Sequence, residues 1–243
     1  MTNKYSKVGR YVASDMMGEL ICDNYPMVFV LNRFGIALGF GDKSIGEVCA
    51  ASNVDVDTFL SVVNLLISDD KGGSGSSSAK SEFEGKVSIP SLMIYLHNSH
   101  NYFLEYRLPA LRQKLVEALG ANSGEEVVNS AIIGYFDEYV AEVRKHMAYE
   151  ESTVFEYVNS LLEGRDTTYD IQIFSEHHDK VEAKLSELKN ILIKYYPAAA
   201  TNQLCSVMFD IFVCEADLAS HNDIEDYLLV PAIRSVENPG CKA

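Results

Sequence analysis

Six histidines lie between positions 97 and 221 of this 243-residue sequence, and the first 96 residues contain none. Two of them begin a His-x-x-x-Glu pair, His146 with Glu150 and His221 with Glu225. Four residues are little more than one helical turn, so each imidazole and its carboxylate project from the same face of a helix. Imidazole and carboxylate donors without thiolate suit iron, and less specifically manganese or zinc.

One such pair is weak evidence, because on an exposed helix it is usually a solvated pair worth about 0.2–0.5 kcal/mol. A third pair, His178 with Glu182, shows how easily the pattern arises, and the charged residues around Glu182 place that carboxylate at a rim or in solvent. The joint pattern is stronger, because His100 and His178 lie on the two remaining expected helices. Each of four helices then offers a histidine. His97 and His177 are as consistent with a supporting or surface position as with a ligand.

The residues around these histidines are apolar. The apolar neighbours lie one or two turns away. They are Tyr139, Val143, Val154 and Tyr157 for His146; Ile171, Phe174, Val181 and Leu185 for His178; and Cys214, Leu218 and Leu228 for His221. The histidines therefore lie on stripes that face a core. Burying several ionisable pairs there without a metal would be costly. The sequence thus predicts a metal site inside a helical bundle.

Four long helices must position these residues, and the patterns place them at about 89–119, 124–162, 168–196 and 198–236. Pro109 falls inside the first helix and should bend or break it, and Pro231 should kink the end of the fourth. Short connections between long amphipathic helices argue for an antiparallel four-helix bundle. The fold class expected is therefore all-α.

A Gly/Ser-rich segment divides the chain. Residues 69–86 read DDKGGSGSSSAKSEFEGK, which is the composition of a flexible linker. It separates a small domain, residues 1–68, from a larger one, residues 87–243. The small domain reads as short helices at 12–20, 27–34, 44–51 and 55–67, with a glycine-punctuated turn at 35–41.

Composition excludes some functions. Lys and Arg number 20 against 35 Asp and Glu, a formal net charge of −15, so the basic footprint of a nucleic-acid or anionic-membrane protein is missing. No stretch approaches the roughly 20 apolar residues of a membrane span, and the N-terminus lacks a signal-peptide core, so we expect a cytoplasmic protein. Five scattered cysteines without a CxxC motif indicate reduced, mostly buried thiols. Cys22 and Cys49 lie in apolar helical stretches, where inert packing is expected.

Several spaced motifs together resemble the hemerythrin-like (HHE cation-binding) proteins, and more specifically the two-domain iron–sulfur cluster repair di-iron proteins of the RIC, or ScdA/YtfE, type. The motifs are His100 with Leu108-Pro109, His146-Met-Ala-Tyr-Glu150-Glu151, Glu176-His177-His178-Asp179, and His221 with Glu225 and Pro231. They span nearly all of the larger domain. The small domain resembles that family's N-terminal helical domain, with one departure. Leu38-Gly39-Phe40-Gly41 stands where the family carries a cysteine-containing pair.

The resemblance implies a non-haem di-iron centre in which an oxo group bridges the two irons. Its metal ligands would be His100, His146, His178 and His221, with Glu150 and Glu225 bridging the two irons. Open iron positions would bind a small diatomic ligand, O₂ or NO. The implied function is repair of stress-damaged iron–sulfur clusters or a response to nitric oxide and oxygen stress, with iron–sulfur protein clients and a homodimer as possible partners.

The alternative function is a module that senses or binds O₂, NO or iron without repair activity, and the missing thiols favour it. Both describe a metal-binding protein more than an enzyme. A metal-free structural bundle is the remaining alternative.

Overall fold

The computed structural model describes residues 9–68, 87–120, 126–165, 169, 171, 179–196 and 201–237. Within these ranges the chain is helical apart from turns and one isolated β-bridge, between Met16 and Ser44. The all-α fold class is therefore confirmed. Contacts divide the chain into two compact units, residues 1–98 with 223–243, and residues 99–222. No helix in the described ranges is long and apolar enough to cross a membrane.

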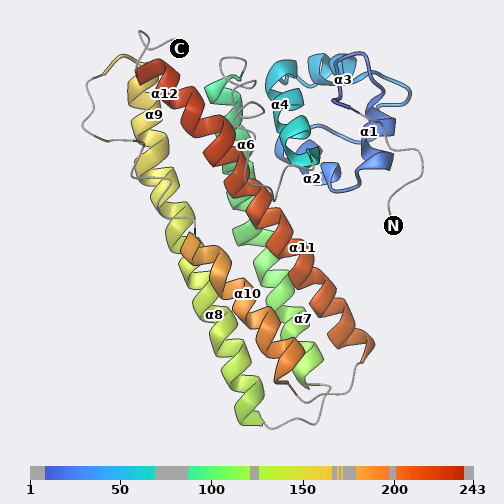
Figure 1. Cartoon of the computed structure of the whole chain (residues 1–243), viewed down its shortest axis with the longest axis vertical. Helices are drawn as coiled ribbons and strands as arrows, with labels where there is room; N and C mark the ends of the chain where they lie inside the picture. Colours follow the sequence, from blue (N-terminus) through green and yellow to red (C-terminus); the bar gives the residue numbers. More distant parts are fainter. Residues whose placement is uncertain are drawn as a thin grey trace. The chain divides into compact units, whose positions relative to one another are not determined.

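The larger domain consists of four helical runs in chain order (Figure 1). They are α6 (Ile89–Asn101), η2 (Tyr102–Arg107) and α7 (Leu108–Gly120); α8 (Glu126–Tyr149), η3 (Glu150–Val154) and α9 (Phe155–Leu162); α10 (Asp179–Lys194); and α11 (Asn202–Ile224), η5 (Glu225–Leu229) and α12 (Val230–Glu237). Segments labelled η are π-helical.

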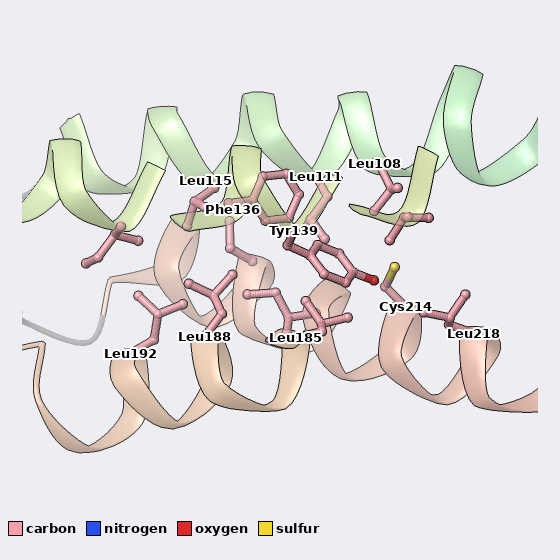
Figure 2. Close-up of a cluster of buried hydrophobic side chains, with 14 of the residues drawn as sticks. Leu108, Leu111, Leu115, Phe136, Tyr139, Leu185, Leu188, Leu192, Cys214 and Leu218 are labelled. Atoms are coloured by element: carbon pink, nitrogen blue, oxygen red, sulfur yellow. The ribbon is translucent and has the colours of Figure 1, made fainter. Parts of the chain in front are cut away.

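One apolar core joins the four runs inside the unit 99–222 (Figure 2). Most of its members recur every three or four residues along each helix, which is the spacing of one helix face. They are Phe103, Leu108, Leu111, Leu115, Ala118 and Leu119; Ile132, Phe136, Tyr139, Val143 and Met147; Leu185, Leu188 and Leu192; and Val207, Ile211, Cys214 and Leu218. Residues 99–222 thus form the helical bundle that the periodicity predicted.

The prolines inside the bundle do not break its helices. The helical run from Ile89 to Gly120 continues through Pro109, so of the expected bend or break the break does not occur. Pro109 and Pro231 each lie two residues after the last residue of a π-helical segment, η2 and η5. Proline lacks the N–H of the α-helical bond, and its ring clashes with the carbonyl four residues earlier. A wider π turn just before each proline accommodates both the missing N–H and the proline ring.

The third helix differs from its expected start at residue 168. Tyr169 lies outside any helix, and the described part of the run is α10, which begins at Asp179. His177 and His178 lie outside the described residues, as does the side chain of Glu182.

The small domain folds into the short helices α1 (Met17–Asp23), α2 (Met27–Arg33), α3 (Ile45–Ala51) and α4 (Val56–Ile67). Local signals fix their starts: Ser44 and Glu47 form a capping box on α3, and Asp55 caps α4 by accepting from the backbone N–H of Thr58. Three glycines of the 35–41 turn have positive φ, which glycine adopts without strain. The expected helices are confirmed, although the first starts at residue 17 rather than 12.

Within the same unit, the small domain contacts helix α6. The Arg33 side chain is 1% exposed, and its Nη1 donates to the Tyr95 hydroxyl at 3.3 Å. The Asn98 amide donates to the Arg33 carbonyl at 2.8 Å, and Phe34 packs on the Tyr95 ring. The end of α2 is therefore tied to α6 by side-chain and backbone contacts.

The described cysteines are reduced and divide by burial. Cys49 and Cys214 are buried, as expected, and burial raises the pKa of their thiols to about 11 and about 12. Cys22 is exposed, so its expected burial is wrong. It lies two residues after the buried Leu20, and two helical steps of about 100° turn it to the opposite face of α1. Cys205 is also exposed.

Candidate metal centre

Polar residues continue the apolar stripes at one end of the bundle core. His100 lies three residues before the core residue Phe103, and Glu150 lies three residues after Met147. His221 lies three residues after Leu218. Because a spacing of three keeps the same helix face, these side chains point inward as the leucines do. Their exposed fractions are 3% for His100 and 0% for both Glu150 and His221.

Glu150 lies between two imidazoles from different helices. Its Oε2 is 3.0 Å from His100 Nε2, and its Oε1 is 2.8 Å from His146 Nε2. The two oxygens of one carboxylate thus face two separate nitrogens. His146 is four residues earlier on the same helical run, so the sequence pair is formed as predicted.

The second predicted pair joins the same cluster. Helix α11 passes directly from His221 into η5, which begins with Glu225, and Glu225 is fully buried. The rings of His100 and His221 lie edge to face with centroids 5.1 Å apart. His100, Glu150, His221 and Glu225 can each bring one ligand atom within 4.8 Å of the others. Four buried nitrogen and oxygen donors therefore converge from three helical runs.

The contacts between Glu150 and the imidazoles shift the pKa of the Glu150 carboxyl and of His100. Burial alone raises the pKa of the Glu150 carboxyl, but hydrogen bonds from His100 and His146 outweigh it and hold that pKa far below its ordinary value. Burial alone lowers the pKa of His100, but its contacts with Glu150 and Glu151 leave that pKa raised. The imidazoles thus favour the charged form of the buried carboxylate. A metal ion supplies positive charge and displaces protons from its ligands. The donor set, imidazole and carboxylate without thiolate, fits iron.

Both glutamates of the predicted pairs begin a π-helical segment. Glu150 is the first residue of η3, and Glu225 is the first residue of η5. The third such segment, η2, begins two residues after His100. π-helical turns occur mostly as single insertions in α-helices and frequently at functional sites. The helices therefore depart from α geometry where they carry the candidate ligands.

Most of the predicted surroundings are confirmed. The described neighbours of His146 and His221 are all buried: Tyr139, Val143, Val154 and Tyr157, and Cys214, Leu218 and Leu228. Ile171 and Leu185, expected near His178, are buried as well. His97 is exposed, whereas His100 on the same helix is buried.

Two contacts of His100 were missed from the sequence. Its Nδ1 lies 2.7 Å from Glu151 Oε1, and its ring stacks on Phe155 with centroids 5.7 Å apart. Glu151 follows Glu150 directly, and neighbouring residues of an α-helix diverge by about 100°, so its sequence position gives no sign of this contact. Phe155, one turn after Glu151, was the only available signal in the sequence.

The comparison with protein families agrees with the site. The Hemerythrin HHE cation binding domain matches residues 94–233, which is more than half of the chain. The chain therefore belongs to the hemerythrin HHE cation-binding family. No curated protein and no solved structure matches the sequence. The matched span includes all six predicted ligands, and the resemblance to the cluster-repair subfamily stays a prediction.

Proposed function

We propose that the chain is a non-haem di-iron protein. The ligands are those that the sequence predicts: His100, His146, His178, His221, Glu150 and Glu225. The observation that carries the proposal is the position of Glu150, whose two oxygens face His100 and His146 separately. A carboxylate that bridges two metals must direct its oxygens to two places in this way. A site for a single ion needs no such division.

The contacts suggest how the ligands divide. His100 and His221 have neighbouring rings and share the four-residue cluster with Glu150 and Glu225, so they would serve one ion. His146 meets the other oxygen of Glu150 and would serve the second ion. His178, which lies outside the described residues, is the remaining nitrogen ligand in this proposal.

Six protein ligands would leave open coordination positions on the two irons. Ferrous iron bound there would supply redox chemistry toward O₂ or NO. The protein's own residues favour a small neutral ligand there. The Phe155 ring stacks on His100, and the Phe103 ring lies edge-on to His221 with centroids 6.0 Å apart. Both phenylalanines are almost fully buried, so apolar groups line the imidazoles and exclude water.

We further propose a role in the response to nitric oxide or oxygen stress, with repair of damaged iron–sulfur clusters as the leading activity. The resemblance of both domains to the repair proteins supports this. The sequence at 38–41 favours the alternative, a binding or sensing module without repair activity, because it has no thiol to act as nucleophile or soft-metal ligand.

Metal content and the visible absorption spectrum test the di-iron proposal. We expect two irons per chain in the wild type, and the loss of at least one iron in Glu150→Ala and in Glu225→Ala. Glu156→Gln is the matched control, because Glu156 lies on the same helical run as Glu150 and its side chain is 66% exposed. Full iron occupancy in the Glu150→Ala/Glu225→Ala double variant contradicts the proposed ligands.

Reactivation of a nitric-oxide-damaged iron–sulfur enzyme separates the two roles. A repair protein loaded with iron restores the activity of the damaged enzyme. Reversible binding of O₂ or NO without any reactivation assigns the chain to the sensing alternative.

A further inference from the structure

The strongest contact of the site outside the predicted ligands joins His100 to Glu151. The distance from His100 Nδ1 to Glu151 Oε1 is 2.7 Å, which is short and typical of a charge-assisted hydrogen bond. An ionised carboxylate only accepts, so the imidazole nitrogen that faces it carries the proton. The other nitrogen, Nε2, faces Glu150 and the buried cluster.

We propose that Glu151 is a positioning residue that fixes His100 with Nδ1 protonated and Nε2 directed at the metal. This inference rests on the proposed function, since it takes His100 as a metal ligand. Hydrogen bonds to the far nitrogen of a ligating histidine set its tautomer and orientation and raise its basicity.

Two consecutive residues, the first two of a π turn, reach one imidazole. Glu150 contacts Nε2 and Glu151 contacts Nδ1 of the same ring. Consecutive side chains of an α-helix diverge by about 100°. A π turn holds more residues, so the angle between neighbours is smaller. That turn, η3, begins at Glu150.

Phe155 holds the face of the same ring. It stacks on His100 with an interplanar angle of 14°, and it lies four residues after Glu151. The hydrogen bond fixes the ring within its plane, and the stacked phenyl ring opposes tilting out of that plane. A flip of the imidazole would break the hydrogen bond to Glu151 and turn a carbon toward the cluster. One helical run therefore supplies a ligand, Glu150, and two residues that orient a ligand from another helix.

The position of Glu151 is that of a residue that orients the ligand His100, and not that of a metal ligand. Its side chain is 34% exposed, whereas Glu150 is fully buried. It bonds to the imidazole nitrogen that faces away from Glu150. The burial and the geometry thus give the two adjacent glutamates different roles.

Three variants test this assignment: Glu151→Gln, Glu151→Ala and the control Glu156→Gln, which makes the same charge change at an exposed position of the same helical run. Ferrous iron affinity is measured by competition with a chromophoric chelator. Independently of metal, proton–nitrogen correlation spectra of metal-free protein labelled at histidine report whether the His100 Nδ1–H is protected from exchange with water.

We expect Glu151→Ala to lose about 10- to 100-fold in iron affinity, the usual cost of removing such a support. The Nδ1–H of His100 should then exchange freely. Glu151→Gln should fold like the wild type and lose several-fold, less than alanine, because its amide oxygen still accepts the hydrogen bond. Two irons should still bind all variants at saturating iron, since no ligand has been removed. Glu156→Gln should match the wild type in both measurements.

Unchanged affinity in Glu151→Gln and Glu151→Ala overturns the inference, and so does a protected Nδ1–H in Glu151→Ala. Equal losses for glutamine and alanine also overturn it, because they assign the effect to charge and not to a hydrogen bond. A wild type that loads two irons in those experiments leaves the proposed function standing. A wild type that binds no iron overturns the proposed function and this inference together.

Discussion

The metal-free protein should depend strongly on Glu150, because this fully buried carboxylate is held by two imidazoles. Glu150→Gln is the chosen change, since it removes the charge and nearly preserves the volume. No cavity forms, so a change in stability reports the lost electrostatic contacts.

The distances of 3.0 and 2.8 Å describe two close contacts between the charged carboxylate and an imidazole nitrogen. Each is worth about 1.5–3 kcal/mol, and together about 3–6 kcal/mol. Glutamine recovers part of this through one neutral hydrogen bond and has a smaller desolvation cost. We therefore expect a net loss of about 3 kcal/mol, close to the roughly 3–5 kcal/mol for breaking a buried pair by removing one partner. At about 2–4 °C per kcal/mol for a chain of this size, the Tm should fall by about 6–12 °C.

Differential scanning calorimetry after chelation measures this loss, with Glu156→Gln as the control. Repeating the scan with ferrous iron tests the bridging role. Free metal at 100 times its Kd stabilises the wild type by about 2.7 kcal/mol. The glutamine variant should gain less, because a neutral amide is a poor bridging ligand.

Coincident Tm values for the metal-free wild type and Glu150→Gln refute the electrostatic argument. An equal rise of Tm with iron in both proteins refutes the bridging role alone.

Three further outcomes are expected. Iodoacetamide at pH 8 should leave Cys49 and Cys214 unmodified while the exposed thiols react, and rapid modification of all thiols in the folded protein contradicts this. Because folding raises the pKa of the two buried thiols, the free energy of unfolding should also fall as pH rises above about 8.5, by about 1 kcal/mol per thiol per pH unit. Leu188→Ala, at a fully buried core position, should cost about 2–5 kcal/mol in chemical denaturation, and a loss below 1 kcal/mol argues against the packed core. Limited proteolysis should cut first within residues 72–80, and the two fragments should elute together on size exclusion because α2 is tied to α6; separate elution contradicts that contact.

Much of the fold follows from local patterns. Apolar residues every three or four positions predicted the bundle helices, and Ser44 and Asp55 mark two helix starts of the small domain through their own side chains. The pairing of His146 with Glu150 is also local, because one helical turn brings the two together. Such signals depend on residues a few positions apart, so a sequence carries them directly.

The sequence was less informative wherever the outcome depends on a distant partner. His97 and His100 lie one turn apart on α6, yet one is exposed and the other is buried against helices that follow much later in the chain. The expectation of a break at Pro109 did not take into account the preceding π turn, where the helix stays continuous. Cys22 was expected to be buried from its apolar surroundings, although its position two residues from Leu20 turns it outward.

The sequence by itself determined the all-α fold class and the two His-x-x-x-Glu pairs, because helical periodicity and turn spacing are properties of neighbouring residues. Only the tertiary structure decided that Glu150 lies between two imidazoles and that Glu151 reaches the far side of His100, 51 positions away. The contacts of Glu150 and Glu151 with His100 require packing between helices, and that packing is fixed by contacts across the bundle and not by the local spacing of residues.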